Sequence, residues 1–257
     1  MLILVTNDDG VQSPGILVLA EYLKSLGEVV IVAPDRERSA VSHALTLHSP
    51  LRADEIKSGI FAVDGTPTDC VNLAIHGILE RKPDLVVSGI NRGANLGDDL
   101  TYSGTVAAAM EATLMGVPAL AISLDSNRFQ AEDFTCAASV AVDLAQRVLT
   151  EGLPVETFLN INVPQGFPSG MLLTRQGKRR FSDLIEKKVD PRGRNYYWLG
   201  AGQVSFDNVE GSDFSAVMQG FVSVTPLHLD MTNYRAFAEL STWGLSGAEQ
   251  AQQLWLL

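Results

Sequence analysis

The chain opens with four consecutive apolar residues, Leu2-Ile3-Leu4-Val5, followed at once by the polar segment Thr6-Asn7-Asp8-Asp9-Gly10. A short apolar run bounded by turn-forming residues is typical of a parallel strand that is buried on both faces. Similar runs alternate with helical spacing along the first two thirds of the chain. They predict strands at residues 28–33, 61–63, 83–90, 117–123 and 158–163, and helices at 14–26, 70–80, 106–115 and 131–149. This alternation predicts an α/β fold with a doubly wound, mostly parallel, Rossmann-like sheet.

The alternation ends near residue 169. The remaining pattern predicts strands at residues 171–174, 195–199 and 220–225, with short helices at 212–218 and 234–240. We therefore expect a Rossmann-like catalytic core over residues 1–169 and a hairpin-rich C-terminal lobe over residues 170–257. Residues 177–194 carry seven of the nineteen Lys and Arg residues but few apolar anchors. A segment of this kind cannot order itself by burial within one subunit, so we expect this basic arm to make oligomer contacts.

Composition narrows the class of protein. The chain has 257 residues, 46% of them hydrophobic, and a formal net charge of −11, which argues against a general nucleic-acid binder. The two cysteines, Cys70 and Cys136, lack the spacing of a metal or redox motif and are expected to be buried apolar side chains. No apolar run is long enough to span a bilayer, so no membrane contact is expected. We expect a cytoplasmic setting.

Two adjacent carboxylates, Asp8 and Asp9, stand where the first strand ends. Ligands of open α/β sheets bind outside the carboxyl ends of the strands. In a turn loosened by Gly10, both side chains can converge on one cation, and closely spaced carboxylates need a cation to stay ionised. The alternative is a loop in which the two acids cap the next helix. Oxygen ligands without a His or Cys cluster suit Mg²⁺, Mn²⁺ or Ca²⁺ rather than zinc.

Other polar segments reach the same edge of the predicted sheet. Ser39 follows the second strand, where a serine is otherwise a turn or cap residue, and Asn91 opens a glycine-rich loop that can approach a ligand closely. Ser103, Gly104 and Thr105 begin a helix, and such a helix N-terminus is suited to binding an anion. The P-loop lysine is missing, which argues against a triphosphate cradle. A hard cation beside an anion site is the arrangement that metal-assisted hydrolysis of a phosphate ester needs.

Several segments carry a resemblance to a known family: Thr6-Asn7-Asp8-Asp9-Gly10, Ala33-Pro34-Asp35 with Arg38-Ser39, Gly65-Thr66-Pro67-Thr68-Asp69-Cys70, Ser88-Gly89-Ile90-Asn91-Arg92-Gly93-Ala94-Asn95, Ser103-Gly104-Thr105-Val106 and Val224-Thr225-Pro226-Leu227. In these motifs and their order the chain resembles the SurE family of stationary-phase survival proteins, which are divalent-metal-dependent 5′-nucleotidases. The resemblance covers nearly the whole chain. One departure is Ala40, because the family usually has glycine after the serine.

The resemblance implies a set of site residues and a reaction. It implies that one divalent metal ion per subunit (Mg²⁺, Mn²⁺ or similar) is bound by Asp8, Asp9, Ser39 and Asn91, with Asp8 and Asp9 as the catalytic residues. It implies that the phosphate is held by Asn95, Ser103, Gly104 and Thr105. The implied substrates are nucleoside 5′-monophosphates, in some members also 3′-monophosphates and short polyphosphate. The implied assembly is a homodimer or homotetramer formed through the C-terminal lobe with exchanged segments.

Rival functions fit the same residues less well. A receiver-type signalling domain also binds Mg²⁺ with an acidic pair, but it needs a phospho-accepting aspartate where this chain has Ser88-Gly89-Ile90-Asn91. A haloacid-dehalogenase-type phosphatase needs a second aspartate two places after the first, and Gly10 stands there. A non-catalytic nucleotide-binding regulator is the remaining alternative. Turnover of AMP with added metal separates an enzyme from such a regulator.

Overall fold

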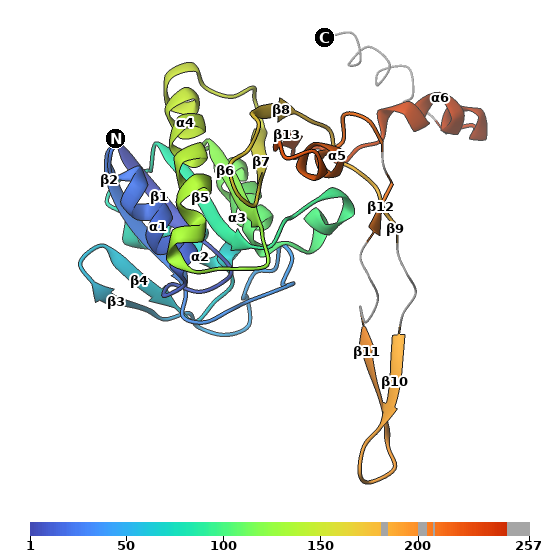
Figure 1. Cartoon of the computed structure of the whole chain (residues 1–257), viewed down its shortest axis with the longest axis horizontal. Coiled ribbons are helices and arrows are strands. Elements are labelled where there is room, and N and C mark those ends of the chain that lie inside the picture. Colours follow the sequence, from blue (N-terminus) through green and yellow to red (C-terminus); the bar gives the residue numbers. More distant parts are fainter. Residues whose placement is uncertain (181–184, 200–204, 208, 246–257) are drawn as a thin grey trace. The chain divides into compact units, whose positions relative to one another are not determined.

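A nine-stranded sheet forms the centre of the protein in the computed structural model, which describes residues 1–180, 185–199, 205–207 and 209–245 (Figure 1). In sheet order its strands are β3 (Ala53–Lys57), β4 (Ile60–Val63), β2 (Glu28–Pro34), β1 (Leu2–Thr6), β5 (Leu85–Arg92), β6 (Ala119–Asp125), β7 (Thr157–Pro164), β13 (Val222–His228) and β8 (Met171–Leu173). Neighbouring strands from β4 to β7 are parallel, whereas β3 runs antiparallel to β4. The predicted mostly parallel α/β sheet is confirmed.

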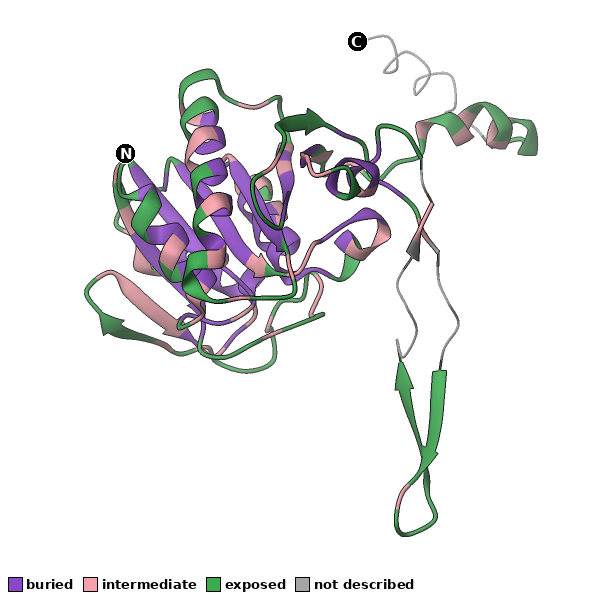
Figure 2. Cartoon of the chain, viewed as in Figure 1, coloured by how far each residue is buried: buried purple, intermediate pink, exposed green. Residues whose placement is uncertain are grey.

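Helices cover both faces of this sheet. They are α1 (Pro14–Leu23) and α4 (Thr135–Glu151), which lie in front of the sheet in Figure 1, and α2 (Pro67–Leu73) and α3 (Gly104–Leu114). One buried apolar cluster joins Ile3 and Val5 to Leu19 of α1 and Ala141 of α4. Since side chains alternate along a strand, the buried Leu4 belongs to the other face, where α2 and α3 pack. Figure 2 shows the result, with burial concentrated in the strands and the inner sides of these helices.

The helix boundaries follow local signals. Thr66 caps α2 through a capping box, in which its hydroxyl accepts from the Asp69 amide and the Asp69 carboxylate accepts from the Thr66 amide. The helix predicted over residues 70–80 is α2 followed by a π-helical turn, Ala74–Ile78. Gly77 lies in that turn, and glycine is a poor α-helix former. The helix predicted from Ala131 begins with a 3₁₀ turn, Ala131–Phe134, before α4.

The C-terminal part divides differently from the pattern-based boundary at residue 169. Contacts group Met1–Leu227 as one compact unit and His228–Leu257 as a second. The physical reason is that β8 and β13, which we assigned to the lobe, pair with each other in the large sheet. Helix α5 (Asp213–Met218) also belongs to the first unit. The second unit contains the 3₁₀ turns Tyr234–Ala236 and Ser241–Trp243, with α6 (Phe237–Leu240) between them.

The described residues of the basic arm take part in two short antiparallel pairs of strands. Strand β9 (Arg179–Arg180) pairs with β12 (Ser205–Phe206), and β10 (Ile185–Val189) pairs with β11 (Asn195–Leu199). Every residue of β10 and β11 is exposed in the single chain (Figure 2). Residues 181–184 of the predicted arm lie outside the described residues. Among the helices that the structure describes, none has the length and apolar character needed to cross a membrane.

Candidate functional site

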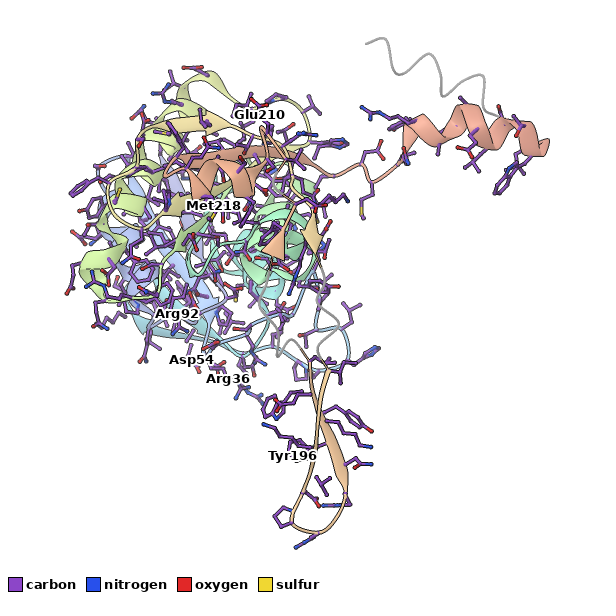
Figure 3. The ribbon with its side chains drawn as sticks, turned by 45° about the vertical axis from the view of Figure 1, so that its right-hand side comes forward. Arg36, Asp54, Arg92, Tyr196, Glu210 and Met218 are labelled. Carbon is purple, nitrogen blue, oxygen red and sulfur yellow. The ribbon has the colours of Figure 1, made fainter. Side chains whose placement is uncertain are left out.

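The candidate site lies where the strand order reverses. From β1 the chain passes to β2 and β4 on one side, and from β5 it passes to β6 and β7 on the other. The carboxyl ends of β1 and β5 therefore meet at a switch point, the place where doubly wound sheets bind ligands. A cavity of about 520 Å³ opens there, and Arg92, labelled in Figure 3, lies on its wall. The cavity is lined by Asp8, Asp9, Glu37, Ser39, Ala40, Asn91, Arg92, Ala94, Asn95, Asp99, Tyr102, Ser103, Phe129 and Arg179.

Six of the eight predicted site residues line this cavity, and the other two, Gly104 and Thr105, are buried against Asp8. The Thr105 hydroxyl donates to Asp8 Oδ1 at 2.5 Å. Gly104 permits this contact, because a Cβ there would lie 2.9 Å from Asp8 Cβ. The first turn of α3 therefore packs directly on the end of β1.

Burial raises the pKa of Asp8. Desolvation is the largest effect and raises the pKa of Asp8 from 3.8 to about 6, the negative charge of Asp9 raises it further, and the Thr105 hydrogen bond opposes both. A buried carboxyl beside a second carboxylate is stabilised in its ionised form by a cation. This is the electrostatic condition expected of a metal ligand.

Asp9 contacts Arg92, a residue that sequence reasoning left without a role. The Arg92 side chain donates from Nε to Asp9 Oδ1 at 2.7 Å, and its backbone amide donates to Asp9 Oδ2 at 3.1 Å. The same guanidinium reaches Glu37 Oε2 at 2.9 Å, and Ser39 Oγ donates to Glu37 Oε1 at 2.6 Å. The available signal was the position of Arg92 directly after Asn91, at the end of the strand that neighbours β1.

The donor atoms around Asp8 suit a hard cation. Asp8 and Asp9 supply carboxylate oxygens and Ser39 a hydroxyl, while Asn91 uses its Nδ2 to donate to the Gly93 carbonyl at 2.8 Å and keeps Oδ1 as an acceptor. Within the described residues no three His, Cys, Asp or Glu side chains gather as a metal cluster. The set therefore consists of oxygen atoms of mixed type, which fits Mg²⁺ or Mn²⁺ rather than zinc.

A buried polar network fixes Asn95. Its backbone amide donates to Asn162 Oδ1 at 2.7 Å, and its carbonyl accepts from Asn160 Nδ2 at 2.9 Å and from Asn162 Nδ2 at 3.0 Å. Its own Nδ2 donates to Ser123 Oγ at 2.8 Å. Sequence reasoning missed these three supporting residues of β6 and β7. The signal was the spacing of Asn160 and Asn162, two apart in an otherwise apolar strand and thus on one face.

Ser103 begins α3 as predicted. Its Oγ accepts from the Val106 amide at 3.1 Å, which leaves the hydroxyl proton available to a ligand. Its side chain is nearly buried and lines the cavity. The free hydroxyl proton of Ser103 and the positive end of the α3 dipole both favour binding of an anion at this point.

The backbone beside Ser39 has an unusual conformation. Ala40, which stands where glycine was expected, has φ +55°, and Ser42 has φ +53°. Residues with a Cβ pay a steric penalty in this left-handed region, whereas glycine does not. The loop thus follows the path for which the expected glycine is suited.

Comparisons with known proteins agree with one another. The family model described as "Survival protein SurE" matches residues 3–183. The chain is 66% identical over 246 residues to "5′-nucleotidase SurE" of Syntrophotalea carbinolica, covering 96% of this chain and 98% of that protein. It is 61% identical over 250 residues to the protein of the same name in Geobacter sulfurreducens, covering 96% and 95%. The crystal structure of the SurE protein from Aquifex aeolicus is 45% identical and matches with a TM-score of 0.83, covering 95% of this chain and all of that one.

The raised pKa of Asp8 generates a prediction for the metal-free protein. The folded state binds this proton more tightly than the unfolded chain, so stability falls as pH rises from about 4 to about 6. In EDTA at pH 8, Asp8→Asn should therefore unfold with a free energy about 2–3 kcal/mol higher than the wild type, and the difference should vanish near pH 3.5. Urea denaturation at both pH values measures it.

The half-buried Asp143, which pairs with Arg147 on the outer side of α4, provides the control. Asp143→Asn should leave the stability near that of the wild type. Added Mg²⁺ or Mn²⁺ should stabilise the wild type and Asp143→Asn but not Asp8→Asn. A metal-free Asp8→Asn protein less stable than the wild type at pH 8 would contradict this account of the carboxyl.

Proposed function

The chain belongs to the SurE family of survival proteins, and from that membership we propose that it uses the cavity at the ends of β1 and β5 as the active site of a 5′-nucleotidase. The enzyme hydrolyses nucleoside monophosphates to nucleoside and phosphate. The observation that supports the proposed site most is that Asp8, Asp9, Ser39 and Asn91 line one cavity together with Asn95 and Ser103. A candidate cation site and a candidate phosphate site thus lie side by side. We also propose that the same site accepts nucleoside 3′-monophosphates and short polyphosphate.

The roles of the metal-binding residues follow from their contacts. Asp8, Asp9, Ser39 and Asn91 would hold one divalent ion, Mg²⁺ or Mn²⁺, which when bound neutralises charge on the phosphoryl oxygens and lowers the pKa of bound water. The hydrogen bonds from Thr105 to Asp8 and from Asn91 to Gly93 orient these side chains before any ligand arrives. Such preorganisation avoids reorientation of the groups during the reaction.

The phosphate is proposed to lie against the start of α3. Ser103 donates its hydroxyl proton, the backbone at Gly104 and Thr105 adds the positive end of the helix dipole, and Asn95 is held rigidly by Asn162. The nucleoside is proposed to contact Tyr102 and Phe129, which line the same cavity and present aromatic surface. The substrate would therefore extend from α3 across the mouth of the cavity.

Assembly is proposed to use the β10–β11 hairpin. Tyr196, Tyr197 and Trp198 are between 41% and 59% exposed in the single chain, and Tyr196 projects from the hairpin in Figure 3. An exposed two-stranded hairpin with this much aromatic surface needs a partner to be stable. We propose that the partner is a second copy of the chain, in a homodimer or homotetramer. We also propose a cytoplasmic setting, which the free thiols of Cys70 and Cys136 support.

The function is tested by turnover of AMP with Mg²⁺ or Mn²⁺, across a panel of nucleoside 5′- and 3′-monophosphates and short polyphosphate. Asp9→Asn should lower kcat by ~1000-fold, because it removes a negative charge from the metal site and a partner from Arg92. Circular dichroism should show an intact fold. Asp143→Asn, on α4, serves as control and should retain wild-type activity. Near-normal turnover by Asp9→Asn at saturating metal would show that the site is assigned wrongly.

The phosphate half of the site has its own test. Ser103→Ala should weaken the binding of inorganic phosphate by about 1–3 kcal/mol, because a hydrogen bond to a charged group is lost. The dissociation constant for Mn²⁺ should stay within about twofold, since Ser103 is not among the proposed ligands. Calorimetric titration with each ligand measures both. Equal losses for metal and phosphate would mean that the two subsites are not separate.

The assembly proposal is tested by removing the hairpin. Deleting residues 185–199 keeps Lys178 and Arg179, which contact Asp98 and Asp99 near the cavity. The shortened protein should form a smaller oligomer than the wild type while still binding Mn²⁺. Trp198→Glu provides a milder variant, because a charge on this surface disfavours an apolar contact. Light scattering gives the mass, and an unchanged mass for both variants would refute the role of the hairpin.

A further inference from the structure

A buried carboxylate outside the cavity holds three chain segments together. Asp213, at the start of α5, is fully buried and accepts three backbone N–H groups. Gly97 donates to Oδ2 at 2.8 Å, while Gly177 and Phe214 donate to Oδ1 at 2.9 Å and 2.7 Å. Gly97 is 116 residues away in sequence, so this contact is a tertiary one.

The segment that Asp213 holds runs between two of the proposed phosphate residues. Gly97 begins the 3₁₀ turn Gly97–Tyr102, with Asn95 two residues before it and Ser103 directly after the turn. The approach is close at this point. A Cβ on Gly97 would lie 3.2 Å from the Gly177 carbonyl, and a Cβ on Gly177 would lie 2.7 Å from Asp213 Oδ1. Asp213, Gly177 and Gly97 are therefore packed in direct contact, with no room for a larger side chain at either glycine.

Further contacts reach the same turn from the same side. Gln176 Nε2 donates to the Gly97 carbonyl at 3.1 Å, and the Arg179 amide donates to Asp98 Oδ2 at 3.0 Å. The Arg179 guanidinium pairs with Asp99, and both of these residues line the cavity. The segment 176–179 thus holds the turn along its length, with Asp213 at its buried end.

Folding of α5 does not account for the buried charge. Ser212 already caps this helix, since its Oγ accepts from the Ser215 amide at 3.2 Å. Removing a carboxylate from water is costly unless its hydrogen bonds replace the lost hydration. Two of the three bonds that do so here come from Gly97 and Gly177 rather than from the helix. The Asp213 carboxylate therefore joins the Gly97 turn and Gly177 to the start of α5.

We propose that Asp213 is a positioning residue for phosphate binding, which holds Gly97 and thereby sets the path of the chain from Asn95 to Ser103. The proposal rests on the proposed function, in which Asn95 and Ser103 hold the phosphate. Asp213 itself lies outside the cavity lining and makes no contact with the proposed metal ligands in the described part of the chain. Its effect should reach phosphate binding and leave the cation subsite unchanged.

Asp213→Asn tests this role. The amide keeps the size of the side chain but turns one acceptor into a donor that opposes a backbone N–H. The KM for AMP and the dissociation constant of inorganic phosphate should each rise ~10-fold, as for one lost hydrogen bond to a charged group. The dissociation constant for Mn²⁺ should stay within about twofold and kcat should change less than KM. Steady-state kinetics and calorimetric titrations on the full-length protein measure these values.

Ser212→Ala is the matched control, because it removes the cap of the same helix without touching Gly97. Both variants should lower the melting temperature, but Ser212→Ala should leave KM and the phosphate constant near wild type. Gln176→Ala, which removes the donor to the Gly97 carbonyl, should raise both by a smaller factor and serves if Asp213→Asn does not fold.

Two outcomes would overturn the role of Asp213. One is unchanged phosphate binding in both Asp213→Asn and Gln176→Ala. The other is an equal rise in KM for Asp213→Asn and Ser212→Ala, which would make the residue merely structural. If the wild type did not hydrolyse AMP, the proposed function would fail, while the phosphate titrations would still decide the role of Asp213.

Discussion

The contact between Asp8 and the first turn of α3 joins the two halves of the site. Asp8 follows the end of β1 by two residues and lies among the proposed metal ligands, while Ser103 caps α3 and Thr105 lies in its first turn, which faces the proposed phosphate. The hydrogen bond from Thr105 and the missing Cβ of Gly104 bring these elements to van der Waals distance. Because burial raises the pKa of Asp8 to about 6, its ionised form is destabilised there and would be stabilised by a neighbouring cation. The geometry of the proposed phosphate site and the charge of the proposed metal site would thus be coupled through the Asp8 side chain.

The charge balance at the cavity involves Arg92 and Glu37 in addition to the proposed metal ligands. Asp9 and Glu37 share the guanidinium of Arg92, and Glu37 also accepts from Ser39. This hydrogen bond from Ser39 is the largest cause that lowers the pKa of Glu37, with Arg92 contributing as well. Arg92 therefore compensates negative charge next to Asp8 in the protein without ligands. A cation bound by Asp9 would share that carboxylate with Arg92, so its affinity would depend on both residues.

The C-terminal part of the protein supports the site as well as extending the sheet. Strands β8 and β13 continue the sheet beyond β7, and segment 176–179 together with Asp213 holds the turn that precedes Ser103. The basic residues at the base of the arm are thus partly used within the chain, as in the pairs of Lys178 with Asp98 and Arg179 with Asp99. The aromatic surface of β10–β11 is the part of the arm that is left for a partner. The residues proposed for assembly are therefore adjacent in sequence to those that contact the turn before Ser103.

Patterns between neighbouring residues were enough to predict the elements and most of the residues that line the candidate site. Apolar runs identified the core strands, and local signals identified the helix starts at Thr66 and Ser103, because caps and turns are interactions between residues three or four apart. The acidic pair Asp8-Asp9 follows a strand directly, so its place at the edge of the sheet needed no knowledge of other segments. For the same reason Ser39 and Asn91 could be placed on that edge.

The contacts that complete and support the candidate site could be found only in the folded protein, because they join residues that are far apart in sequence. Arg92 meets Asp9 across 83 residues, Asn162 holds Asn95 across 67, and Asp213 holds Gly97 across 116. These are hydrogen bonds that no periodic pattern marks, and they form because neighbouring strands and loops bring distant segments together. The sheet position of β8 and β13 has the same origin, since a short strand carries no signal for its neighbour. Caps, turns and strand ends can be predicted from adjacent residues, because the interactions that form them are local. The pairing of distant segments depends on the packing of the whole chain.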